Sequence, residues 1–114
     1  MRRIPKASRP SPAGSAPVFA ALGDKTRLWL VSRLCEAGPL SIARLTAGAK
    51  VTRQAVTKHL RVMEKSGLVR SCRRGRERRW QLNQQRLADA RLYLDQISTQ
   101  WDAALNRLRA YVEG

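Results

Sequence analysis

The residues best suited to chemistry in this sequence are basic and amide side chains along residues 52–66. At about 100° per residue, Val56, Leu60 and Met63 fall on one arc of a helix, with His59 beside them. The opposite arc carries donors that can reach base edges and phosphates, although an ordinary solvated helix can also have a basic face. We expect six residues of this segment to contact DNA: Thr52, Arg53, Gln54, Thr57, Lys58 and Arg61.

A second group of cations follows this helix, where two extended runs flank a turn at Gly75. The pattern predicts a β-hairpin over residues 68–82, with Val69, Trp80 and Leu82 packed against the helices. A guanidinium group can contact phosphate through two hydrogen bonds or enter a narrow minor groove of DNA. The alternative interpretation is that these arginines are only a solvated run of charge. A β-hairpin that follows a recognition helix is called a wing. We expect four arginines of this wing to contact DNA: Arg73, Arg74, Arg76 and Arg78.

The net charge is concentrated in the same region. The 114-residue chain has a formal net charge of +15. Residues 50–80 hold eleven basic and two acidic side chains, whereas residues 84–114 hold four of each sign. Because so many like charges repel one another, the composition favours a polyanionic partner that neutralises them. No segment reads as a membrane span or a secretory signal, so we expect a cytoplasmic protein without a membrane partner.

Length and composition predict one domain. A chain of 114 residues, 43% of them hydrophobic, suffices for one packed core but not for two. Four of the five prolines lie within residues 1–17, which we expect to form a disordered basic tail. This tail is either a solubilising extension or an arm that contacts phosphates. The DNA-binding domain should then span residues 18–113.

Turn residues and capping residues divide residues 18–66 into four helices. We expect a short helix over residues 18–22, followed by helices capped by Asp24, Ser41 and Thr52. In the second helix, five side chains are expected to face the core: Leu28, Leu30, Val31, Leu34 and Cys35. Trp29 falls outside this arc, and we expect it either to pack on a partner subunit or to line an effector pocket.

The last segment predicts a dimer. Residues 84–113 contain neither proline nor glycine, and apolar side chains recur every three or four positions. A helix of this length extends about 45 Å, so one small protomer cannot bury its whole apolar stripe. We therefore predict a mainly α, dimeric winged helix-turn-helix with five helices and a two-stranded wing. Its dimer interface should include Phe19, Leu87, Leu94, Ile97, Trp101, Leu105 and Leu108.

Four local motifs resemble the ArsR/SmtB family of winged-helix regulators. They are residues 18–27 (VFAALGDKTR), 54–60 (QAVTKHL), 64–69 (EKSGLV) and 74–76 (RGR), the last followed by a tryptophan where the family usually has a smaller aromatic. The resemblance covers residues 18–112. It implies a homodimeric, sequence-specific repressor that binds an inverted-repeat operator. It also implies that His59 helps to hold the recognition helix.

The sequence departs from the metal-sensing members of this family. Those members bind ions through cysteines of the third helix or through Asp and His ligands of the last helix, and neither set is present here. The resemblance is therefore to the non-metal-sensing branch, with no metal or other cofactor and with an undefined small-molecule effector. We expect no enzyme activity, because the single histidine has no nucleophile and acid around it.

Two other functions stay open at this point. In a thiol-based redox or persulfide sensor, Cys72 would react because neighbouring arginines could lower its pKa, with Cys35 as a second thiol. In a sequence-neutral nucleic-acid-binding protein, charge alone would provide affinity. The chain offers few aromatic side chains on which single-stranded bases could stack, which disfavours this second alternative.

Overall fold

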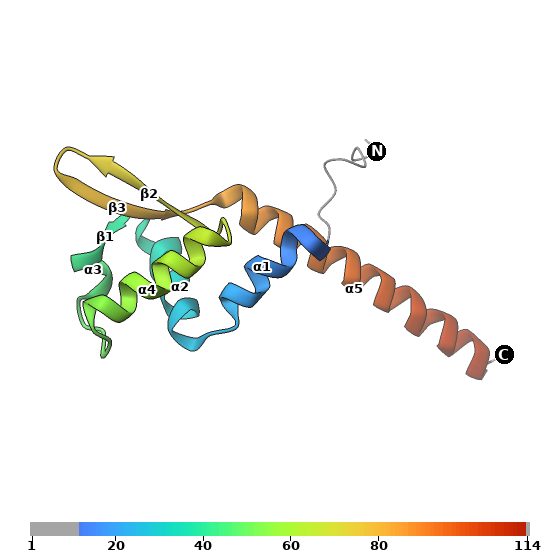
Figure 1. Ribbon diagram of the computed structural model, residues 1–114. Helices are drawn as coiled ribbons and strands as arrows, with labels where there is room; N and C mark the ends of the chain where they lie inside the picture. The colour runs from blue at the N-terminus through green and yellow to red at the C-terminus, as the bar shows by residue number, and fades with distance from the viewer. Residues whose placement is uncertain (1–11, 114) are drawn as a thin grey trace.

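Four helices and a β-hairpin gather at one end of the protein, and a long C-terminal helix leads away from them (Figure 1). The structure is a computed structural model that describes residues 12–113. Within this range the elements are α1 (Pro12–Leu22), α2 (Lys25–Ala37), β1 (Leu40–Ser41), α3 (Ile42–Thr46), α4 (Arg53–Lys65), β2 (Val69–Arg74), β3 (Glu77–Leu82) and α5 (Gln84–Glu113). The predicted fold class, a mainly α winged helix-turn-helix with five helices, is confirmed.

The core is formed where α1, α2, α3, α4 and the sheet meet. Its largest fully buried side chains are Leu30, Leu45, Leu60, Met63, Leu68, Val18, Val56 and Val69. Hydroxyl caps start the two helices of the helix-turn-helix. The Ser41 hydroxyl accepts from the Arg44 amide at 3.3 Å, and the Thr52 hydroxyl accepts from the Ala55 amide at 3.1 Å. Both bonds satisfy amides that the first turn of a helix leaves unpaired.

The wing belongs to a three-stranded antiparallel sheet with the order β1-β3-β2, one strand more than predicted. Strands β2 and β3 pair from Val69 opposite Leu82 to Arg74 opposite Glu77. Strand β1 adds Leu40 opposite Trp80 on the other edge of β3. A strand of two residues is too short to show an alternation of apolar and polar side chains, so the sequence pattern does not predict it.

Helix α1 begins earlier than the sequence pattern predicts. The tail was expected to extend through residue 17, but α1 starts at Pro12, so the prediction is wrong for residues 12–17. Proline is compatible with the first helical position, and Ser15 and Val18 are buried where α1 packs on α5, α2 and α4. Residues 1–11 of the expected tail, with the proposed disorder and phosphate contacts, lie outside the described residues.

Helix α2 buries a narrower arc than expected. Leu30 and Leu34 are buried, but Leu28 is 50% exposed and Cys35 is also exposed. Helix α2 contacts α1, α4 and β3, and these neighbours cover only the Leu30 side of the helix. The prediction that Leu28 and Cys35 face the core is therefore wrong.

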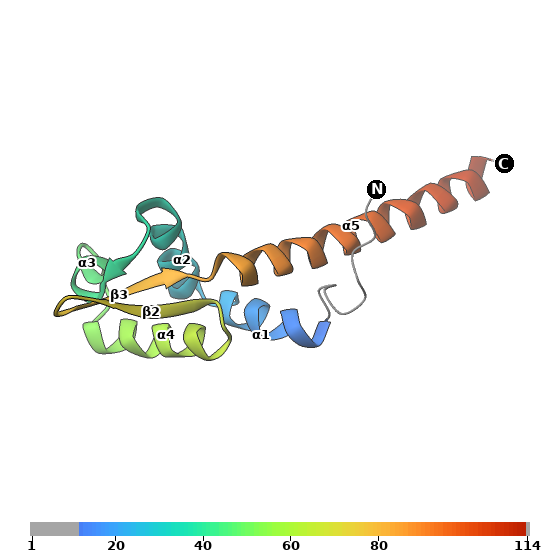
Figure 2. The same ribbon diagram turned by 90° about the horizontal axis from the view of Figure 1, so that it is seen from above.

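Helix α5 makes the protein long. The described residues measure 65 × 32 × 23 Å with a radius of gyration of 18.3 Å, against about 13 Å for a compact domain of this size. Figure 2 shows that the C-terminal half of α5 extends well past α1. Ala90 is the buried residue of this helix, and no helix among residues 12–113 has the length and apolar character needed to cross a bilayer.

Asp24 caps α2 and links it to α4, and this cap predicts a pH effect. The Arg27 amide donates to Asp24 Oδ2 at 3.0 Å, and this bond holds the pKa of the carboxyl below its ordinary value of 3.8. Since the folded-state pKa is lowered, the ionised carboxylate stabilises the fold above pH 3.8. This contribution is lost as the pH falls through the lower folded-state pKa.

We therefore expect Asp24→Asn, which keeps an oxygen acceptor at the cap, to unfold at lower urea than the parent near neutral pH. The difference between the two urea midpoints should disappear as the pH is lowered below 3.8. Asp24→Ala is the control, because it lacks the acceptor and should be less stable than Asp24→Asn at every pH. A constant difference between the parent and Asp24→Asn over the whole pH range would contradict this account.

Candidate nucleic-acid interface

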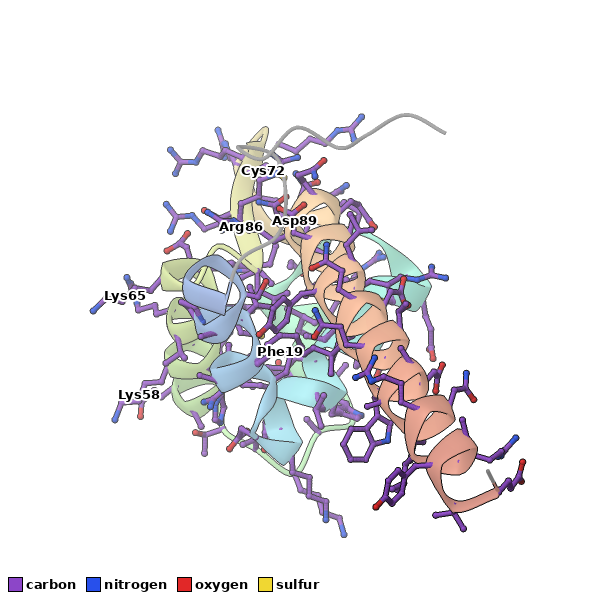
Figure 3. All side chains as sticks on the ribbon, turned by 90° about the vertical axis from the view of Figure 1, so that its right-hand side faces the viewer. Phe19, Lys58, Lys65, Cys72, Arg86 and Asp89 are labelled. Atoms are coloured by element: carbon purple, nitrogen blue, oxygen red, sulfur yellow. The ribbon has the colours of Figure 1, made fainter. Side chains whose placement is uncertain are left out.

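The core fixes which face of α4 points outward. Val56, Leu60 and Met63 are fully buried on one side of the helix. Figure 3 shows Lys58 and Lys65 projecting from α4 to the same side, away from the body of the protein. The helix therefore presents its donors on an exposed, outward face, as an element that enters a DNA major groove must.

The structure divides the six predicted recognition residues into two groups. Arg53, Gln54, Lys58 and Arg61 are exposed. The hydroxyls of the two threonines instead bind the backbone of α4 itself, since Thr52 caps the helix and Thr57 donates to the Arg53 carbonyl at 2.9 Å. Lys65, which was not among the predicted contacts, is exposed at the C-terminal end of the same face.

The four predicted wing arginines are all exposed; the strand register places Arg73, Arg74 and Arg78 on two faces, and Arg76 lies in the turn between the strands. Arg73 lies directly opposite Arg78, on the face that carries the buried Val69 and Trp80 farther along the strands. Like charges directly opposite one another destabilise a strand pair by about 0.2–1 kcal/mol. The arrangement is therefore costly for the isolated protein and favourable next to a polyanion.

The other face of the wing is partly neutralised. Arg74 lies opposite Glu77 in the ladder, and Arg79 donates to Glu77 at 2.8 Å. Among residues 12–113 this is the ion pair that a lysine or arginine forms, and the Asp24 carboxylate also lies 3.9 Å from His59 Nδ1. Between Lys50 and Trp80, only Arg79 among the described lysines and arginines thus has an acidic partner.

The tip of the wing and the start of α4 lie at the same end of the molecule, in both views (Figures 1 and 2). Between them is a groove of about 420 Å³, lined by Ser41, Ile42, Ala43, Arg53, Arg76, Glu77, Arg78 and Trp80. Three arginines from two separate elements thus surround one hollow. The Trp80 side chain is 4% exposed and its Nε1–H has no hydrogen-bond partner among the described residues. The sequence pattern did not reveal this groove, because its walls come from distant segments.

His59 lies on the flank of α4 that faces α2. Arg27 Nη1 lies 3.3 Å from His59 Nδ1, and the Asp24 carboxylate is 3.9 Å from the same nitrogen. Since the guanidinium can only donate, Nδ1 acts as the acceptor in this contact. These contacts agree with the expectation that His59 helps to hold α4 in place.

The seven residues predicted for the dimer interface fall in two parts. Phe19 and Leu87 are half-buried against the protomer's own core, where the Phe19 ring lies 6.1 Å from the Tyr93 ring, between α1 and α5 (Figure 3). The remaining five are exposed large apolar side chains of α5: Leu94, Ile97, Trp101, Leu105 and Leu108. Together with Tyr111 and Val112, they leave one apolar stripe of the long helix open to solvent.

The two thiols lie on different elements. Cys35 is exposed on α2, and Cys72 is half-buried on β2 opposite Arg79, whose guanidinium is engaged by Glu77. Within residues 12–113, no three His, Cys, Asp or Glu side chains are placed to hold a metal ion together. The positions of the two thiols do not favour a thiol-responsive repressor over a repressor that responds to another signal.

Comparisons with known proteins match the same region. A family described as a helix-turn-helix domain matches residues 22–72. An HTH-type transcriptional regulator of Mycobacterium tuberculosis is 39% identical over 87 residues, which are 76% of this chain and 78% of the relative. The solved structure of an ArsR-like transcriptional regulator from Rhodococcus sp. RHA1 shares 36% identity and a TM-score of 0.77, covering 86% of this chain and 92% of that chain.

A third protein shares the fold at lower identity. It is a homodimeric winged helix-turn-helix DNA-binding domain from Mycobacterium bovis, described as a possible ArsR-family regulator. It is 20% identical with a TM-score of 0.60, covering 77% of this chain and 80% of that chain.

The opposed arginines of the wing give a test with two readouts. In Arg78→Gln we expect the free energy of unfolding to stay equal or to rise by up to about 1 kcal/mol, because the repulsion with Arg73 is removed. Affinity for duplex DNA should fall, and the slope of log affinity against log salt should become shallower by about 0.9 for each phosphate that the variant no longer neutralises. Urea unfolding and fluorescence anisotropy measure the two effects.

The matched control is Arg91→Gln, the same change at an exposed position of α5 far from the wing. It should alter neither the affinity nor the salt slope. Equal DNA binding by the Arg78→Gln and Arg91→Gln proteins would rule out the wing as part of the DNA interface.

Proposed function

Because the chain belongs to the ArsR-like family of winged helix-turn-helix transcriptional regulators, we propose that it represses transcription as a homodimer bound to an inverted-repeat operator. As a member of this family it is a DNA-binding regulator of transcription and not an enzyme. The observation that carries the finer proposal is the cationic surface shared by α4 and the wing, in which Arg79 is the one lysine or arginine with an acidic partner among the described residues. A surface of that charge fits a double-stranded polyanion.

In the proposed complex, α4 enters the major groove with its N-terminal residues toward the bases. Arg53 and Gln54, both exposed, have the side chains that recognise guanine and adenine through paired hydrogen bonds. Lys58 and Arg61 lie one and two turns farther along and are suited to phosphates. The groove between Arg53 and the wing would then receive the DNA backbone where it passes between the two elements.

The homodimer is supported by the part of α5 that no other described element covers. Ile97 is 43% exposed and Trp101 is 66% exposed, although both lie on the stripe that begins in the core near Ala90. A two-fold pairing of α5 would bury this stripe, and the similar domain from Mycobacterium bovis is homodimeric. Two-fold symmetry would also set two recognition helices at a fixed spacing, as a palindromic operator requires.

Selection from a random pool of duplex DNA tests the operator. We expect an inverted repeat with half-site centres one helical turn apart, about 10–10.5 base pairs, or a multiple of this spacing. Gln54→Ala should lower the discrimination at one base pair per half-site by about 1–3 kcal/mol. Lys58→Gln should instead weaken operator and random DNA by the same factor, which makes it the control for loss of charge. Equally tight binding of the parent protein to random DNA would overturn the proposal.

The dimer is tested by adding charge to the stripe. In the double variant Ile97→Asp and Trp101→Asp we expect a folded monomer by sedimentation equilibrium, because two carboxylates would be desolvated in the pairing. Binding to the two-half-site operator should be weakened by at least tenfold through loss of the second recognition helix. The matched control carries the same charges on the opposite side of α5, at the exposed Thr99 and Asn106, and should remain dimeric. An unchanged mass of the first variant would exclude this face.

A further inference from the structure

We propose that Trp29 forms one wall of a binding site for an aromatic carboxylate, and that the bound anion weakens the binding of α4 to DNA. The second half of this statement rests on the proposed function, whereas the first half does not. The site lies between the first turn of α2 and the segment that joins α3 to α4. It is separate from the exposed face of α4 and from the stripe of α5.

A defined hollow carries the proposal. Its volume is about 390 Å³, and it is lined by Lys25, Thr26, Trp29, Gly48, Ala49, Lys50 and Val51. Sites for small organic ligands usually span about 300–1,000 Å³, so this one suits a molecule of one or two rings. Gly48 has a φ of 75°, and nothing lies within 4 Å of the point where a Cβ would be, so bare backbone forms part of the wall.

The indole ring of Trp29 is held before any ligand arrives. The guanidinium carbon of Arg33 lies 5.3 Å from the centre of the ring. Arg33 is itself fixed, because its Nη2 donates to the Arg44 carbonyl at 2.8 Å in α3. Trp29 is nevertheless 36% exposed. A large aromatic surface that is fixed in position and still open to solvent is what a planar ligand needs for stacking.

The indole of Trp29 favours an aromatic ring in the ligand, and the charge of the lining favours a carboxylate. Lys25 and Lys50 are the ionisable residues of the hollow, and both are cationic; Lys25 begins α2, and Lys50 lies in the segment that joins α3 to α4. Neither forms an ion pair with any other described residue. The remaining side chains include Trp29, Ala49 and Val51, which are apolar. An aromatic ring on this floor with a carboxylate between the two ammonium groups satisfies both features at once.

The position of the hollow connects it to DNA binding. Residues 48–51 lead directly into Thr52, whose hydroxyl caps α4. An anion held by Lys50 would neutralise positive charge three positions before Arg53, at the end of α4 proposed to read bases. Because coupling between two ligands is reciprocal, whatever lowers DNA affinity in the liganded protein must lower ligand affinity in the DNA complex.

The binding half is tested by the indole N–H signals of the full-length protein in a ¹⁵N-correlated NMR spectrum, with Trp29→Phe to assign the signal of Trp29. The probe is 2-naphthoate. We expect a saturable shift of the Trp29 signal, and a smaller response to 2-naphthamide, which has the ring without the charge, and to hexanoate, which has the charge without the ring. Lys25→Gln and Lys50→Gln should each weaken 2-naphthoate about two- to fivefold.

The matched control is Lys65→Gln, at a lysine of α4 outside the hollow, which should leave the affinity for 2-naphthoate unchanged. No shift of the Trp29 signal at millimolar 2-naphthoate, or equal affinity for the amide, would overturn the site.

The regulatory half is tested with the selected operator. Saturating 2-naphthoate should lower operator affinity about fivefold or more in the parent protein, and the ratio with and without ligand should return to one in Trp29→Ala. A shifted Trp29 signal with unchanged operator affinity overturns the coupling and leaves the site intact. If the protein without ligand fails to prefer any operator, the proposed function fails, while the NMR titration still decides the site.

Discussion

The arrangement depends on the burial of one face of α4. With Val56, Leu60 and Met63 fully buried, the helix cannot rotate without exposing apolar surface worth several kcal/mol. Its donors are consequently held in one direction, and Arg27 of α2 contacts its flank through His59. The cationic surface is thus a consequence of core packing, and it carries almost no acid that could neutralise it. A polyanion is the partner that such a surface lacks.

Long periodic elements could be predicted from the sequence, and features that arise between elements could not. The two arcs of α4, the hairpin about Gly75 and the extent of α5 follow from local spacing and turn residues. Strand β1 exists only because β3 lies beside it, and the first turns of α1 depend on packing against other helices. Whether Leu28 or Cys35 is buried likewise depends on which neighbours cover α2.

The candidate site shows the same division. The exposed basic residues of α4 and the wing were identifiable by residue type and position, whereas the two hollows were not. The groove brings Arg53 to Arg76 and Arg78 across more than twenty residues of chain, and the hollow at Trp29 joins α2 to the segment before α4. The sequence marked Trp29 only as a misplaced aromatic. Its fixation by Arg33 requires knowledge of where the Arg44 carbonyl lies.

The register of the wing decides where its charge is available. Successive side chains of a strand point to opposite faces, so the burial of Trp80 assigns Arg78 to the inner face and Glu77 to the outer face. On the outer face, Glu77 pairs with Arg79. A slip of one residue would turn Trp80 out to solvent and would bring Glu77 to the inner face, which carries Arg73 and Arg78. The hydrophobic anchor therefore controls the electrostatics: burying one tryptophan keeps the wing's only carboxylate off the face where Arg73 and Arg78 remain uncompensated.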